Sequence, residues 1–214
     1  MIVRDGKHLT EQQLAEIKKH VNLTHGRLGE CYAAFMLFKE IELTREALPF
    51  MMEPFSRYGD FWREVRHCAI SKTIIDIGAL VDQRSDVASL CSLYRLCVKI
   101  HKTHCVEAKR YIDEVRGTWG TYRHKLIGHN DASRDVVMIE FSKEGFTVER
   151  MEEEIGKLGF AFNVLYAVFC GQTPPRFEDS LSQDAHFVVA GEKVRFDTRS
   201  FLDAIAQHLP QMVG

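Results

Sequence analysis

The chain has 214 residues, of which 45% are apolar, so it can bury a core and forms one large domain or one domain with an appendage. Its net charge of −2 is not that of a strongly basic nucleic-acid-binding chain. The N-terminus lacks the apolar segment of a signal peptide, and no apolar run reaches the roughly 18 residues that span a membrane. Six cysteines without a Cys-x-x-Cys pair indicate a reducing compartment, so the sequence predicts a cytoplasmic protein without membrane contact.

The first 47 residues contain the signals of one long helix. Thr10 and Gln13 have the spacing of a capping box, in which each side chain bonds the other residue's backbone N–H. Apolar residues then recur at helical spacing over residues 10–47. Gly26 and Gly29 are positions where this helix could break or kink.

Two or three further helices are predicted before the centre of the chain. Asp60 can cap a second helix, whose apolar stripe extends over residues 62–80. Ser85 or Asp86 is expected to open a third, and a further helical stretch reaches Arg116.

After the centre, the patterns predict small β additions followed by a helix. The apolar residues 136–141 and residues 146–148 flank a tight turn, which predicts a hairpin. Alternatively, Thr147 caps the next helix, which has a strong apolar stripe and ends at Gly171.

The C-terminal part differs in character. Residues 187–189 and 194–196 flank a turn and predict a second β-hairpin, followed by a short helix over residues 199–208. The predicted fold is therefore mainly α, a helical bundle with a small β-hairpin near the C-terminus. We expect residues 1–171 to form the bundle and residues 172–214 to form an appendage packed on the same domain.

Charge is concentrated in the middle of the chain. Residues 95–129 carry eight Lys or Arg and three Asp or Glu, a net of +5, together with four histidines. Residues 130–214 have a net of −6, and residues 1–94 a net of −1. This asymmetry allows a local phosphate-binding surface on a nearly neutral protein, or it marks solvated helix faces only.

The stretch 119–131, in the centre of the chain, holds most of the candidate functional groups. Gly117 and Gly120 predict a helix break just before it. Arg123 and His129 are six residues apart, so on one regular helix they would lie about 240° apart around the axis. They can converge on one substrate if the helix ends between them, or if a second chain supplies another copy of the pair.

Spacings of three and four place Tyr122, Lys125 and His129 on one face of a helix. Lys125 beside His129 would lower the histidine's pKa by repulsion between like charges.

An arginine and a histidine held together suit cleavage of a phosphodiester. Arginine binds a phosphate through two parallel hydrogen bonds and stabilises the charge that grows on it. Histidine can take a proton from a ribose 2′-OH or give one to the leaving oxygen. RNA supplies its own nucleophile, so this chemistry requires no metal and no other cofactor. The same spacing also fits a surface arginine and a packed histidine without any catalytic role.

Residues 123–129 resemble the arginine–polar–four residues–histidine signature of the HEPN superfamily, with His124 at the polar position. Residues 119–131 are similar to the R-x-K-x-x-A-H-x-D segment of abortive-infection, AbiU-type HEPN proteins, although Gly128 stands where alanine is common. Residues 77–82 resemble the end of the preceding helix. The resemblance covers about residues 10–170 and leaves the C-terminal hairpin unassigned.

The resemblance implies a helical bundle that dimerises and places two motif copies at one cleft. It implies a metal-independent endoribonuclease of a defence or toxin–antitoxin type, with RNA as substrate and an antitoxin or a nucleotidyltransferase as a possible partner. An inactive HEPN module that binds nucleotide or another protein is the alternative. The implied catalytic residues are Arg123, His129 and His124, and the implied substrate-binding or supporting residues are Tyr122, Lys125, Asn130 and Asp131.

Other clusters carry weaker signals. His101 and His104 are three residues apart with Cys105 adjacent, and Cys97 is the nearest further ligand, but these residues complete no known metal-site spacing. No metal site is therefore predicted. Cys68 follows a histidine without a recognisable acid partner, so we expect it to lie in the core.

Overall fold

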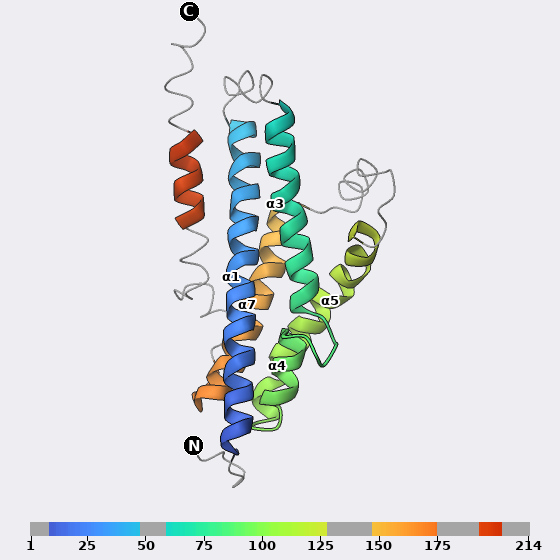
Figure 1. Ribbon diagram of the computed structural model, residues 1–214, viewed down its shortest axis with the longest axis vertical. Helices are drawn as coiled ribbons and strands as arrows, with labels where there is room; N and C mark the ends of the chain where they lie inside the picture. Colours follow the sequence, from blue (N-terminus) through green and yellow to red (C-terminus); the bar gives the residue numbers. More distant parts are fainter. Residues whose placement is uncertain (1–8, 48–58, 128–146, 175–192, 203–214) are drawn as a thin grey trace, which may run out of the picture. The chain divides into compact units, whose positions relative to one another are not determined.

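A computed structural model describes residues 9–47, 59–127, 147–174 and 193–202, of which residues 45–47 and 120–127 are described by their backbone alone. These residues are mostly helical, and no β-strand occurs among them. Figure 1 shows the helices in chain order. Helix α1 is Glu11–Ala47, α3 is Gly59–Leu80, α4 is Leu90–Cys97, the 3-10 helix η2 is Thr103–Cys105, α5 is Val106–Ile127 and α7 is Val148–Cys170. A further helix covers residues 193–202.

The first helix forms as its sequence predicts. The backbone N–H of Thr10 donates to Gln13 Oε1 at 3.0 Å, and the N–H of Gln13 donates to Thr10 Oγ1 at 3.2 Å, which confirms the capping box. Helix α1 then continues without a break past Gly26 and Gly29.

Helix α4 begins later than predicted. Its N-cap is Ser89, whose hydroxyl accepts from the N–H of Ser92, while the Ser92 hydroxyl accepts from the N–H of Ser89. The residues favoured from the sequence, Ser85 and Asp86, lie in the preceding loop because only Ser89 has a reciprocal partner three residues on.

Helix α7 confirms the alternative prediction for Thr147. Thr147 Oγ1 accepts from the N–H of Arg150 at 3.2 Å and caps the helix, so the predicted hairpin strand at residues 146–148 is wrong at Val148, which is helical. The helix ends as predicted at Gly171, whose φ of 70° lies in the left-handed region that favours glycine.

The chain divides into two compact units, and α1 and α3 each contribute one part to both. The first unit contains the described residues within Met1–Leu28 and Ile74–Gln183. There α4 and α5 pack on α7, as Figure 1 shows. Several contacts join the start of α1 to this unit. His20 lies 3.1 Å from the Ser92 hydroxyl, and the His25 ring lies 5.5 Å from that of Phe162. Arg27 donates from Nη1 to the Ala88 carbonyl at 3.3 Å.

The second unit contains the described residues within Gly29–Thr73 and Asp184–Gly214. The helix over residues 193–202 contacts α1 through charge. Arg195 lies 3.1 Å and Arg199 4.0 Å from the carboxylate of Glu40, whose side chain is only 5% exposed. The Trp62 ring of α3 lies 6.5 Å from that of Phe201.

The helix at residues 193–202 corrects the prediction for the C-terminal part. Residues 194–196, predicted as the second strand of a hairpin, are helical, and the final helix begins six residues earlier than expected. Its contacts with Glu40 and Trp62 outweigh the β-propensity of Val194 and Phe196. The first predicted strand lies outside the described residues, and the division into residues 1–171 and 172–214 stays a prediction.

Candidate functional site

Helix α5 carries the first half of the central motif and is anchored in the core of the first unit. Four of its buried apolar residues recur at spacings of four, three and four: Ala108, Ile112, Val115 and Trp119. Trp119 is fully buried. The rotation of α5 about its axis is therefore fixed up to a point four residues before Arg123.

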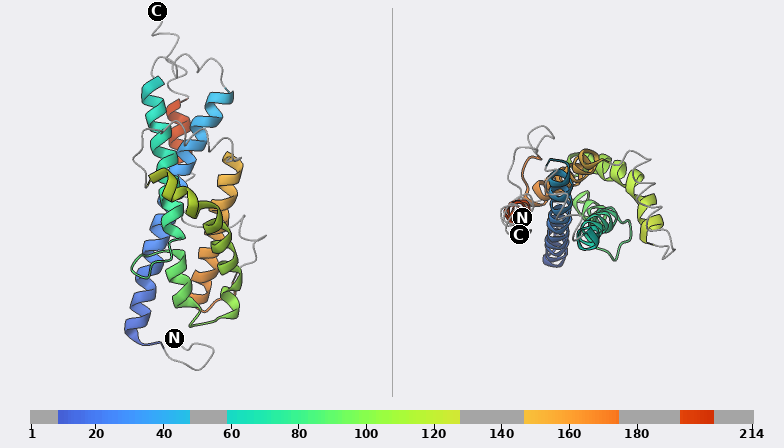
Figure 2. Two further views of the ribbon diagram at one scale, coloured as in Figure 1. Left: turned by 90° about the vertical axis from the view of Figure 1, so that its right-hand side faces the viewer. Right: turned by 90° about the horizontal axis from the view of Figure 1, so that it is seen from above.

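Gly117 and Gly120 do not break α5, contrary to the prediction. The helix continues to Ile127, although it curves, so that its last part runs in a different direction from its first (Figure 2). Each glycine costs a helix about 1 kcal/mol relative to alanine. Burial of Trp119 and the packing of α5 on α7 exceed that cost.

The motif residues fall into two groups. Tyr122, Arg123, His124 and Lys125 belong to the last two turns of α5. Tyr122 and Lys125 are one turn apart, as predicted. The remaining motif residues, His129, Asn130 and Asp131, lie outside the described residues. The predicted roles of all seven therefore stay predictions.

A groove of about 300 Å³ opens between α4 and α5, on the part of α5 that precedes the motif. The residues that line it combine three cations and one carboxylate with an amide, an aromatic ring, a thiol and an aliphatic side chain. They are Gln83, Cys91, Tyr94, Arg95, Lys109, Ile112, Asp113 and Arg116. The net charge of this lining is +2.

Asp113 organises the charges on the α5 side of the groove. Its carboxylate pairs with Lys109 one turn earlier and, at 3.0 Å, with Arg116 almost one turn later. The side chains of Lys109 and Arg116 are 42% and 33% exposed, so both cations can also meet a ligand from solvent.

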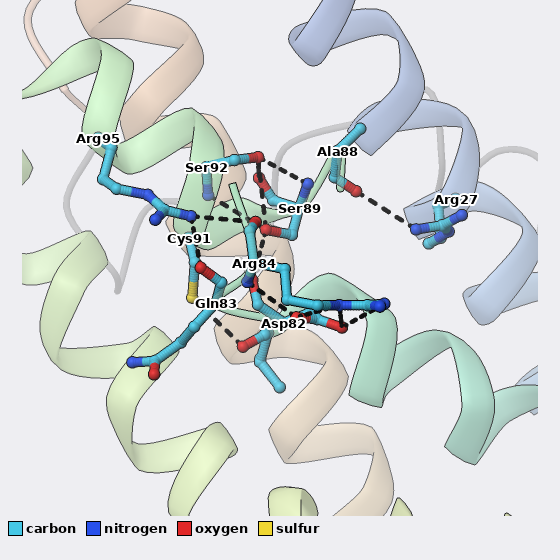
Figure 3. A network of polar contacts seen from close by, with 10 residues as sticks. Arg27, Asp82, Gln83, Arg84, Ala88, Ser89, Cys91, Ser92 and Arg95 are labelled. Carbon is cyan, nitrogen blue, oxygen red and sulfur yellow. Dashed lines mark hydrogen bonds and ion pairs between the residues drawn. The ribbon is translucent and has the colours of Figure 1, made fainter. Parts of the chain in front are cut away.

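The loop before α4 forms the other rim, and its polar contacts are drawn in Figure 3. Arg95 donates from Nη2 to the carbonyl of Gln83 at 2.7 Å and to that of Arg84 at 3.2 Å. Ser89 donates its hydroxyl to the Asp82 carbonyl at 2.7 Å. These bonds tie the start of the loop, residues 82–84, to α4, and the two acceptors of Arg95 are uncharged carbonyls.

Cys91 supplies a weakly polar surface in this groove. Burial raises the pKa of its thiol above the ordinary value, although Arg116 and Arg95 act in the opposite direction. Its Sγ lies 3.3 Å from the Val81 carbonyl. Burial therefore favours the uncharged form of this thiol.

The other candidate clusters have ordinary structural explanations. The rings of His101 and His104 stack at 3.6 Å, while Cys97 and Cys105 are buried. Among the described residues, no three His, Cys, Asp or Glu side chains gather as a metal site would need. Cys68 is exposed, so its expected place in the core is wrong.

The sequence did not single out the groove as a site. One signal was present in the positive charge of residues 95–129, and another was the seven-residue spacing of Lys109, Arg116 and Arg123. A seven-residue repeat returns to nearly the same side of a helix. The residues from the loop and from α4 could not be assigned to the groove from the sequence, because only the fold brings them next to α5.

Comparison with known proteins identifies the family. The sequence model of the HEPN family described as AbiU2 matches residues 15–176, about three quarters of the chain. No curated protein and no solved structure matches the chain. None of the described helices has the length and apolar character that crossing a membrane requires. The mainly helical fold agrees with the family match, and the chain belongs to the AbiU2 family of HEPN proteins.

Proposed function

We propose that this protein is a metal-independent endoribonuclease of abortive infection, which cleaves RNA through the ribose 2′-OH at a site shared by two chains. The observation that carries the proposal is the match to the AbiU2 family over residues 15–176, because this region retains both Arg123 and His129. A module that only binds a partner has no chemical need for both.

The position of the motif on α5 supports this function. Arg123 stands on a helix that Trp119 anchors in the core, whereas His129 follows two residues after the last described residue of α5. On one straight helix the two residues would face apart, so the proposed site needs a change of direction after Ile127 or a second chain. A dimer that brings two motif copies to one cleft meets this requirement.

The proposed reaction is a displacement at phosphorus. The 2′-oxygen of a ribose attacks the adjacent phosphorus and forms a P–O2′ bond, while the bond to the 5′-oxygen of the next nucleotide breaks. His129 of one chain would take the 2′-OH proton, and the second His129 would protonate the leaving oxygen. Arg123 would stabilise the charge on the phosphoryl oxygens, and His124, Asn130 and Asp131 would orient the reacting groups. The products are a 2′,3′-cyclic phosphate and a 5′-hydroxyl.

The first experiment compares wild type with His129→Ala on a mixed RNA pool in the presence of EDTA. We expect wild type to cut and leave cyclic-phosphate ends, and His129→Ala to lose about 10²- to 10⁴-fold in rate, as the removal of a general acid–base predicts. Arg110→Gln is the matched control, because Arg110 lies on α5, is half exposed, and faces away from the buried side.

Two results would contradict the enzyme proposal. Cleavage that survives both Arg123→Ala and His129→Ala would show that this motif is not the site. A wild-type protein that is folded and dimeric but inert would favour the alternative, a HEPN module that binds nucleotide or a protein partner.

A further inference from the structure

We propose that the groove between α4 and α5 is an RNA-binding subsite, which holds the phosphate backbone and one base of the strand a few nucleotides from the bond that is cut. This inference rests on the proposed function, because it assigns a place to the same substrate. All residues of this subsite belong to the first unit.

The charge of the groove suits a polyanion. Three cations face it, Arg95, Lys109 and Arg116, against the single carboxylate of Asp113. Asp113 already pairs with two of them, but these ion pairs are partly exposed and therefore weak. A phosphate can accept hydrogen bonds from Lys109 and Arg116 without displacing Asp113, because each cation has further N–H donors.

The groove also has a surface for a base. Tyr94 lines it, and its ring lies 5.9 Å from Lys109 Nζ. Ile112 and Cys91 add apolar surface to the lining. Proteins that bind single-stranded nucleic acid combine a positive groove with aromatic rings on which bases stack. Tyr94 beside Lys109 has this combination, whereas a site for inorganic phosphate would need no ring.

Two cations of the groove and the position of the motif arginine share one spacing on α5. Lys109, Arg116 and position 123 follow one another at seven-residue intervals, which is close to two turns of an α-helix. Each interval corresponds to about 10 Å along the axis. This is the length of about three stacked nucleotides at about 3.4 Å each. A strand with a phosphate at Arg116 therefore reaches Arg123 within a few nucleotides.

The test measures binding separately from cleavage. The probe is a fluorescent, 12-nucleotide single-stranded RNA with 2′-O-methyl riboses, which the proposed reaction cannot cut. Its affinity for dimeric full-length protein is measured by anisotropy at several salt concentrations, for wild type, Arg116→Gln, Lys109→Gln and Asp113→Asn. Arg110→Gln is the control because it removes the same charge from an exposed residue of α5 that does not line the groove.

Each cation that contacts a phosphate contributes about 0.7 to the slope of log affinity against log salt for a single strand. We expect Arg116→Gln and Lys109→Gln each to lower the slope by that amount and to weaken binding by about eightfold in 50 mM salt. Asp113→Asn should tighten binding, which a misfolded variant would not do. Arg110→Gln should leave the slope unchanged.

The outcomes separate the two proposals. If Arg116→Gln, Lys109→Gln and Arg110→Gln all bind like wild type while wild-type protein cleaves RNA, the subsite is wrong and the enzyme proposal stands. If the groove variants lose binding but wild-type protein never cleaves, the subsite stands and the enzyme proposal fails. Binding of adenosine monophosphate that depends on Arg116, without binding of the oligonucleotide, would overturn the RNA subsite in favour of a free nucleotide.

Discussion

The rings of Tyr111 on α5 and Phe160 on α7 meet edge to face, with centroids 5.3 Å apart. Phe160 is 2% and Tyr111 8% exposed, so this contact lies in the core that holds the motif helix. Edge-to-face pairs add about 0.5–1.5 kcal/mol beyond the area they bury. The orientation of α5 therefore depends on a residue far from the motif in sequence.

Replacing Phe160 should destabilise the protein strongly. We expect Phe160→Ala to lower the free energy of unfolding by about 3–5 kcal/mol, since it leaves a cavity between α5 and α7. Chemical denaturation followed by circular dichroism measures this change. Phe196→Ala is the control, because Phe196 is 72% exposed and its replacement should change stability by less than about 0.5 kcal/mol.

Replacing Gly117 and Gly171 by alanine should change the free energy of unfolding in opposite directions. Gly117 lies inside α5, and a Cβ there would meet no atom within 4 Å, so Gly117→Ala should raise the free energy of unfolding by about 0.5–1 kcal/mol. Gly171 has a φ of 70°, so Gly171→Ala should lower it by about 1 kcal/mol. Thermal unfolding of both variants measures the difference. A Gly117→Ala protein less stable than wild type would contradict the open surroundings of that position.

Ser89, which caps α4, should contribute more to the free energy of unfolding than the exposed Ser85 in the same loop. Ser89→Ala removes the acceptor for the Ser92 N–H and the donor to the Asp82 carbonyl, and should cost about 1–2 kcal/mol. Ser85 is exposed, so Ser85→Ala should cost less than about 0.5 kcal/mol. Equal losses in urea denaturation would show that the cap is not what stabilises this turn.

The cysteines should react with iodoacetamide in an order set by burial. Cys68 and Cys170 are exposed and should react first. Burial raises the pKa of Cys105 to about 11 and raises that of Cys97 further. Because only the thiolate reacts, about one Cys105 in a thousand is reactive at pH 8 even before access is considered. Peptide mass spectrometry of native and unfolded protein measures the order, and early labelling of Cys105 would contradict its burial.

The motif arginine should not be replaceable by lysine. Arg123→Lys keeps the charge but loses the planar pair of donors, so we expect cleavage to fall about 10²-fold or more. His124→Asn should retain most activity, because the HEPN motif typically has Asn, Asp or His at this position. Rates on one defined RNA at equal dimer concentration measure both. Full activity of Arg123→Lys would show that Arg123 acts as a simple positive charge.

The sequence predicted helix ends correctly where a capping residue determines the end. The pairs Thr10–Gln13 and Thr147–Arg150 and the glycine at 171 mark helix ends correctly because they act within four residues. The start of α4 was misjudged because Ser85, Asp86 and Ser89 are all good caps, and only the reciprocal bond with Ser92 distinguishes Ser89.

Tertiary contacts explain what the sequence could not predict. The continuity of α5 through Gly117 depends on the buried Trp119, and the helical state of Val194–Phe196 accompanies the contact of Arg195 with Glu40. The groove joins α4, α5 and the loop between α3 and α4, so its residues come together only in the fold. The motif residues were recognisable from their pattern, but that pattern does not specify how Arg123 meets His129.

The contact between Glu40 and the helix over residues 193–202 has a consequence for how this protein is divided. The match to the family ends at residue 176, yet Arg195 and Arg199 beyond that boundary pair with Glu40, a buried carboxylate inside it. A fragment trimmed to the matched region would lose both arginines that pair with this carboxylate, so we expect it to be less stable than the chain that keeps them. The boundary of the family match and the boundary of the compact unit therefore do not coincide in this chain.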